Sequence, residues 1–173
     1  MLSKNIIITG FMGTGKSTVG KSLAFILKKQ FLDMDSLIEE KEGKSITDIF
    51  QLKGENYFRN LEKNILKEII MGENMVIATG GGALLEEDNF ILANKEGLVV
   101  LLKATPTVIF SRLKKDKNRP LLSGDDKLRK IIDLMEKRKE KYDRFANSID
   151  TSDFTVEQIV GEIIKIYRRK YNE

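Results

Sequence analysis

Short apolar runs alternate with longer amphipathic stretches along the chain. The runs have the length and the β-branched composition of buried strands, and they lie at residues 5–9, 31–32, 75–78, 98–102 and 148–149. The intervening stretches carry apolar residues three or four positions apart, which predicts helices at residues 19–27, 58–69, 131–135 and 156–167. Ser45 with Asp48 resembles a capping box that opens a helix at residues 46–53, and Thr105-Pro106 predicts the start of another helix. Strands that are apolar throughout and alternate with helices predict an α/β fold, in which a parallel sheet is covered on both faces.

Composition narrows the class of protein. The 173 residues are 41% hydrophobic and 32% charged, as in one compact globular domain. The sequence has no cysteine and no histidine, so carboxylates, lysines or tyrosines must supply any acid–base chemistry. The net charge of +4 is spread over lysines that alternate with glutamates, which favours a solvated face or small-anion sites over a nucleic-acid surface. We see neither a signal peptide nor a membrane span and therefore expect a cytoplasmic protein.

The first strand leads into a phosphate-binding motif. Residues 10–17 read GFMGTGKS, which matches G-x-x-x-x-G-K-[ST] between a predicted strand and a predicted helix. Glycines let backbone N–H groups surround phosphate oxygens, Lys16 can reach the β- and γ-phosphates, and the Ser17 hydroxyl can bind Mg²⁺. A glycine-rich turn with a chance lysine is the alternative, but the strand and helix around it favour nucleotide binding. The residues predicted to bind ATP here are Gly13, Thr14, Gly15, Lys16, Ser17 and Thr18.

A switch GTPase would share this loop, but it usually reads guanine with Asn-Lys-x-Asp. The nearest match, NKEG at residues 94–97, lacks the carboxylate that binds the base. A kinase instead needs a second site for the acceptor of the phosphoryl group.

Two segments at strand ends are candidates for that acceptor site. Asp33 and Asp35 follow the second strand, where one carboxylate could hold a metal-bound water and the other could accept a proton from a hydroxyl. Either carboxylate could instead cap the next helix. Residues 80–82 are three consecutive glycines after the third strand, which permit a close backbone approach or simply form a turn.

Two predicted helices carry further candidates. Arg59 and Glu62 lie three positions apart, where the alternative is a surface ion pair. Arg138 and Tyr142 lie four positions apart and could equally belong to a solvated face. Neither pair alone indicates a function.

Taken in order, the phosphate loop and the segments DMD, GENYFRNLE, TGGGA, NRPLL and R-x-x-x-Y resemble the shikimate kinases. These belong to the nucleoside monophosphate kinase-like P-loop enzymes, and the resemblance covers essentially the whole chain. It implies a single domain over residues 1–173, with a three-layer α/β/α fold and a five-stranded parallel sheet in the order 2-3-1-4-5. It also implies a substrate-binding helical region at about residues 34–62 and a mobile lid at about residues 114–126.

The resemblance also assigns roles around the acceptor. Asp35 is implied to contact the shikimate hydroxyls and to act as the catalytic base, while Arg59 and Arg138 grip the shikimate carboxylate. Glu62 is implied to support Arg59 and the pocket. The residues implied to line the substrate directly are Phe50, Phe58, Gly80, Gly81 and Gly82.

Around ATP, Ser17 and Asp33 are implied to hold one Mg²⁺ per subunit, Asp33 through water. Arg119 is implied to close over ATP with the lid and to act with Lys16 on the phosphoryl group in transfer. Arg112 is implied to stack on adenine, with residues 149–152 on the same side. One departure from the family is visible, because residues 139–142 read KEKY where Pro-Leu-Tyr often ends this motif.

The expected reaction transfers the γ-phosphoryl group of ATP to the 3-hydroxyl of shikimate, giving 3-phosphoshikimate and ADP on the pathway to chorismate and the aromatic amino acids. The expected enzyme is a monomer whose partners are shikimate and ATP, without nucleic acid or membrane. Two alternatives stay open. A related kinase could act on gluconate or a nucleoside monophosphate, because an arginine pair also binds phosphate, and a regulatory module could bind nucleotide without turnover.

Overall fold

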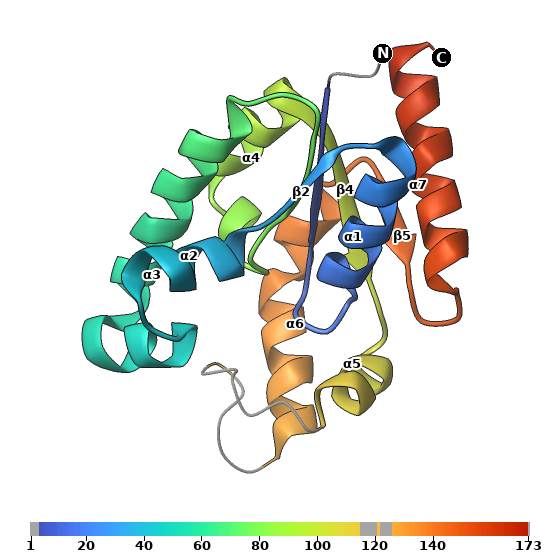
Figure 1. The fold of residues 1–173 in the computed structure, drawn as a ribbon. Coiled ribbons are helices and arrows are strands. Elements are labelled where there is room, and N and C mark those ends of the chain that lie inside the picture. Colours follow the sequence, from blue (N-terminus) through green and yellow to red (C-terminus); the bar gives the residue numbers. More distant parts are fainter. Residues whose placement is uncertain (1–3, 115–120, 122–125, 173) are drawn as a thin grey trace.

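Five strands form one parallel sheet in the computed structural model, which describes residues 4–114, 121 and 126–172 (Figure 1). The strands are β1 (Asn5–Gly10), β2 (Gln30–Asp33), β3 (Met75–Ala78), β4 (Gly97–Lys103) and β5 (Ser148–Asp150). Their order across the sheet is β2-β3-β1-β4-β5, and each neighbouring pair is parallel. The predicted α/β class and the sheet order implied by the resemblance are confirmed.

Helices connect the strands. They are α1 (Lys16–Leu27), α2 (Met34–Glu42), α3 (Ile46–Ile70), α4 (Glu87–Glu96), α5 (Pro106–Leu113), α6 (Lys127–Asp143) and α7 (Val156–Tyr171), with a 3₁₀ turn η1 (Ala83–Leu85). Apolar periodicity did not predict α4, because Asn89 and Ala93 are the two residues that this helix buries. Within the described ranges, no helix has both the length and the apolarity that a membrane crossing requires.

Alternation along the central strands separates two apolar cores. Ile7 of β1 faces a cluster shared with α2, α3 and α4, while Ile6 and Ile8 face a cluster shared with α1 and α7. Figure 1 shows these two groups of helices on opposite sides of the sheet. Both faces of β1 are therefore buried, which explains its continuous apolar sequence.

A third, smaller cluster lies where β1 and β4 end. It contains Phe11 and Ala104, the residues that follow these strands, together with Ile109 of α5 and Ile131 of α6. This packing holds α6 beside the carboxyl ends of the strands, where ligands bind in open parallel sheets.

Helix α3 is broken at Gly54, whose φ of 80° and ψ of 171° are not helical. The break falls between the two helices predicted at residues 46–53 and 58–69. Phe50 and Phe58 lie on either side of it, with ring centroids 4.7 Å apart. The kink thus brings two aromatic rings from successive segments of one helix together.

Candidate active site

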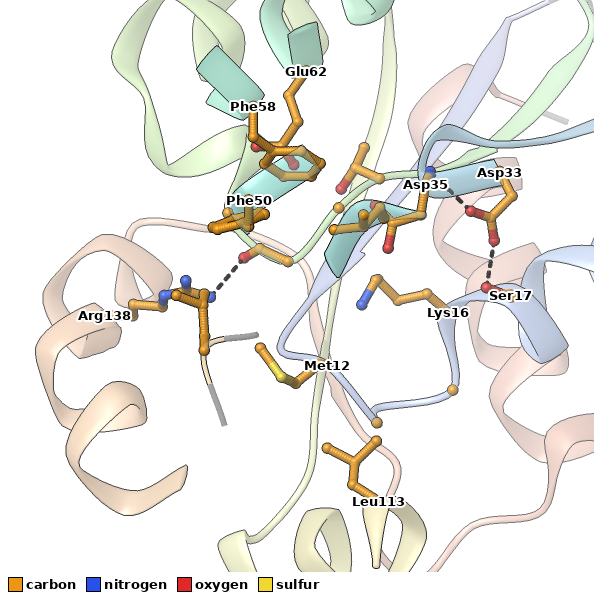
Figure 2. Close-up of a pocket in the computed structure, with 18 of the residues that line it drawn as sticks. Met12, Lys16, Ser17, Asp33, Asp35, Phe50, Phe58, Glu62, Leu113 and Arg138 are labelled. Carbon is orange, nitrogen blue, oxygen red and sulfur yellow. Dashed lines mark hydrogen bonds between the residues drawn. The ribbon is translucent and has the colours of Figure 1, made fainter. Parts of the chain in front are cut away.

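A cleft of about 220 Å³ opens at the carboxyl ends of β1, β2 and β3 (Figure 2). Its walls come from the loop after β1, the start of α2, the kinked α3, the glycine turn after β3, and α6. The predicted site residues that line it are Gly13, Gly15, Lys16, Ser17, Thr18, Asp33, Asp35, Phe50, Phe58, Arg59, Glu62, Gly80, Gly81, Gly82 and Arg138. Residues from five separate segments therefore meet in one cavity.

The phosphate loop is shaped by its own internal contacts. Gly13 and Gly15 adopt φ angles of 79° and 93°, which residues other than glycine rarely adopt. The Thr14 hydroxyl is buried and donates to the Phe11 carbonyl at 2.7 Å, so the Thr14 side chain serves the loop itself. The Lys16 ammonium donates to the carbonyls of Gly10 and Phe11 at 2.9 and 3.1 Å. These contacts within the protein give the phosphate loop a defined shape.

Asp33 caps α2, which is one of the two alternatives that the sequence left open. Its Oδ1 atom accepts from the backbone N–H groups of Asp35 and Ser36 at 3.1 and 3.4 Å, which caps α2. Its Oδ2 atom accepts from the Ser17 hydroxyl at 2.5 Å. A hydroxyl and a carboxylate beside a phosphate loop fit Mg²⁺, which takes oxygen ligands and usually keeps several waters.

Glu62 does not belong to a surface ion pair, because its side chain is only 1% exposed. Arg59 donates to its Oε2 atom and, at 2.9 Å, to Glu55. Burial raises the pKa of Glu62 to about 7, although Arg59 lowers it, and the nearby Asp35 carboxylate raises it further. Burial lowers the pKa of Arg59, but Glu62 and Glu55 outweigh it, so that pKa is raised. Arg59 is thus held from two sides by α3 itself.

The three glycines lie where a side chain would crowd its neighbours. A Cβ atom on Gly80 would lie 2.2 Å from Oε1 of Glu62, and one on Gly82 would lie 2.5 Å from Nη1 of Arg59. A Cβ atom on Gly81 would lie 3.2 Å from the Gly10 carbonyl oxygen in the phosphate loop. None of the three has a positive φ. The bare backbone therefore lets the turn pack directly against the buried ion pair and the phosphate loop.

Arg138 and Tyr142 both turn inward from α6, so the solvated-face alternative is wrong for this pair. Arg138 is only 8% exposed, and its guanidinium lies 5.7 Å from the centre of the Phe11 ring. Arg138 and Tyr142 both donate to the Gly81 carbonyl, at 3.3 and 2.8 Å respectively. Figure 2 shows the Arg138 contact across the cleft from Lys16.

The residues predicted around adenine also come together, beside the phosphate loop. Arg112 donates to the Gly13 carbonyl at 3.2 Å and to the hydroxyl and carbonyl of Thr151 at 3.0 and 2.7 Å. It therefore links the phosphate loop to the segment after β5. Arg119 and most of the lid predicted at residues 114–126 lie outside the described residues.

Some cleft residues had no role in the sequence prediction. They are Met12, Ile46, Thr79, Leu113 and Leu121. Four of them are apolar, and an apolar side chain gives no indication of catalysis or ligand binding. The positions of Met12 within the phosphate motif and of Thr79 beside the glycines could have indicated these two residues. Tyr142 was noted only as part of a motif, and its contact depends on packing between α6 and the glycine turn.

Comparison with known proteins identifies the family. A sequence model described as shikimate kinase matches residues 12–168. This chain belongs to the shikimate kinase family. The shikimate kinase of Caldanaerobacter subterraneus subsp. tengcongensis is 47% identical over 165 residues, which cover 95% of this chain and 96% of that protein. The shikimate kinase of Sulfurihydrogenibium sp. is 49% identical over 168 residues, which cover 96% and 99%.

A solved structure agrees with this membership. The shikimate kinase from Acinetobacter baumannii, in complex with shikimate, superposes with a TM-score of 0.90 at 36% identity, covering 95% of this chain and 92% of that chain. The family resemblance drawn from the order of the motifs is confirmed.

Proposed function

We propose that this chain transfers the γ-phosphoryl group of ATP to the 3-hydroxyl of shikimate, producing 3-phosphoshikimate and ADP. Shikimate kinase activity follows from its family, and the roles of individual residues are our assignment. The observation that carries the assignment is the meeting of a phosphate loop, an aspartate and two arginines in one cleft.

The arginines suit the acceptor's carboxylate. Arg59 comes from α3 and Arg138 from α6, so two guanidinium groups reach the cleft from different walls. Guanidinium groups present fixed pairs of N–H donors that match a carboxylate better than an ammonium does. Phe50 and Phe58 supply apolar surface for the ring of shikimate, and Glu62 keeps Arg59 in place.

Asp35 and Lys16 are positioned for the transfer step, and Figure 2 shows both pointing into the cleft. Asp35 accepts the proton of the 3-hydroxyl while the oxygen of that hydroxyl attacks the γ-phosphorus. The bond from that phosphorus to the bridging oxygen breaks, and this oxygen leaves with ADP. Lys16 donates to the phosphoryl oxygens, where negative charge shifts during transfer.

Ser17 and Asp33 would hold Mg²⁺, Asp33 through water, and the ion when bound neutralises charge on the ATP phosphates. We assign Arg112 to the adenine side, and we assign Arg119 to the phosphoryl group from the family pattern. We expect a monomer with one Mg²⁺ per subunit, acting in the cytoplasm.

A coupled assay of ADP release tests the function. Mg-ATP would be offered with shikimate, gluconate, AMP or no acceptor, with Lys16→Ala as the inactive control. We expect release only with shikimate and only from the unaltered chain. Release with another acceptor would overturn the acceptor assignment, and ATP binding without release would favour a regulatory module.

A further inference from the structure

The Gly81 carbonyl oxygen is shared by two donors from one face of α6. The Tyr142 hydroxyl lies 2.8 Å from it, and Nη1 of Arg138 lies 3.3 Å from it. A carbonyl oxygen has two lone pairs and can accept both bonds. The shorter bond is the stronger, so Tyr142 is the principal partner of this carbonyl and Arg138 is held only weakly.

The position of the Tyr142 hydroxyl is fixed by packing of its ring. The ring contacts both the core on the α3 side of the sheet and the small cluster around Phe11, and its centroid lies 6.4 Å from that of Phe145. Burial also raises the pKa of Tyr142, although Arg138 lowers it, so the hydroxyl keeps its proton and remains a donor at neutral pH. Tyr142 therefore offers the Gly81 carbonyl a permanent, rigid donor.

Because the Tyr142 hydroxyl binds the Gly81 carbonyl, the Arg138 guanidinium can bind a ligand in the cleft. A guanidinium has five N–H donors, and one long bond to Gly81 leaves the fork available to an anion in the cleft. Without the Tyr142 hydroxyl, Arg138 would be the remaining described donor to this partly buried carbonyl. A carbonyl that is partly shielded from water is costly to leave without a donor, so Arg138 would be drawn toward Gly81 and away from the acceptor.

We infer that Tyr142 is a positioning residue for shikimate, whose hydroxyl holds the Gly81 carbonyl and so leaves the Arg138 guanidinium to the substrate carboxylate. This inference rests on the place given to Arg138 in the proposed function. The same hydrogen bond also orients the turn, because in a trans peptide the Gly82 N–H points opposite to the Gly81 carbonyl and thus away from α6.

The substitution Tyr142→Phe tests this, since it removes the hydroxyl and keeps the ring that packs. We expect the KM for shikimate to rise about three- to ten-fold, the effect of one lost hydrogen bond, with kcat and the KM for ATP within about two-fold of the original values. An unchanged KM for shikimate would overturn the inference.

Tyr167→Phe is the matched control. The Tyr167 side chain is fully buried, and its hydroxyl, like that of Tyr142, donates to a backbone carbonyl, that of Lys4 at 2.9 Å. Lys4 precedes β1, so this bond lies at the opposite end of that strand from the cleft. We expect Tyr167→Phe to lower the melting temperature without changing the KM for shikimate, and an equal rise in KM would overturn a specific role for Tyr142.

A double substitution separates positioning from a direct or purely structural role. If Tyr142 acts through Arg138, then adding Tyr142→Phe to Arg138→Ala should leave kcat/KM for shikimate within about two-fold of that of Arg138→Ala alone. If Tyr142→Phe lowers kcat/KM for shikimate by the same factor in the unaltered chain and in Arg138→Ala, the inference is contradicted. Absence of shikimate-dependent ADP release from the unaltered chain would instead refute the proposed function itself.

Discussion

The carboxylates Asp35 and Glu62 line the same cleft in different surroundings. Glu62 is almost fully buried and is held by Arg59, whereas Asp35 is partly exposed at the start of α2. A buried carboxylate engaged by an arginine is poorly placed to exchange protons with a substrate. We therefore assign the proton transfer to Asp35 and the positioning of Arg59 to Glu62.

Replacing Asp35 by Asn keeps the size of the side chain but removes the base. We expect kcat to fall by about 10²- to 10⁴-fold, the usual worth of a positioned acid–base group, with little change in ATP affinity. Steady-state kinetics and ATP titration would check both. Turnover close to that of the unaltered enzyme would exclude Asp35 as the base.

The raised pKa of Glu62 predicts how stability depends on pH. Between the unfolded value of 4.5 and the folded value of about 7, the native state keeps a proton that the unfolded state has lost. Binding of this proton stabilises the native state, and the stabilisation is complete below pH 4.5 and is lost as pH rises through about 7. Relative to Glu62→Gln, which cannot ionise, the unaltered protein should lose roughly 1–3 kcal/mol in its free energy of unfolding between about pH 5 and pH 8.

Urea unfolding of both proteins at several pH values would measure this difference. Glu62→Gln keeps the shape of the side chain, so packing is matched. Parallel stability curves for the two proteins would show that Glu62 does not titrate in this range.

At the scale of elements, the break in α3 sets the shape of the acceptor wall. Gly54 ends one helical segment and begins another, and the two rings that it brings together, Phe50 and Phe58, both line the cleft. Its φ of 80° lies where residues with a Cβ are strained, although no atom lies within 4 Å of the place a Cβ would take. The requirement for glycine at this point is one of backbone angle alone.

Two glycine-to-alanine substitutions test that requirement with opposite expected signs. Gly54→Ala should lower the free energy of unfolding by about 1 kcal/mol, because alanine is strained at positive φ. Gly161 lies within α7 with open space around it and no positive φ, so Gly161→Ala should raise stability by about 0.5–1 kcal/mol. Thermal unfolding compares them directly, and equal shifts of one sign would contradict the angle-based explanation.

Elements with a strong periodic pattern were predictable, and those defined by their neighbours were not. A capping box predicted the first segment of α3, and the second segment of α3 and all five strands followed from the apolar pattern. Helix α4 did not, because few of its side chains enter a core. The spacing of residues along each helix likewise did not decide whether Glu62 and Arg138 lie on the surface or in the site. Their burial depends on the glycine turn packing against α3 and α6, which spacing along one helix cannot reveal.

At the scale of the whole molecule, sheet order arranges the parts of the site in a row. The ends of β2, β3 and β1 are adjacent, which places Asp33, the glycine turn and the phosphate loop side by side. The end of β5 lies on the other side of β4, where Thr151 meets Arg112. An acceptor at β2 and β3, phosphates at β1 and adenine toward β5 would therefore follow one edge of the sheet.

The position of phosphorylation tests this arrangement most directly. The purified chain would be incubated with Mg-ATP and shikimate, and the product would be examined by phosphorus–proton correlation NMR. We expect the phosphorus to couple to the proton on carbon 3 of shikimate, because Asp35 should face that hydroxyl when the arginines hold the carboxylate. A phosphate on carbon 4 or 5, or ADP release without phosphorylated shikimate, would contradict the proposed arrangement.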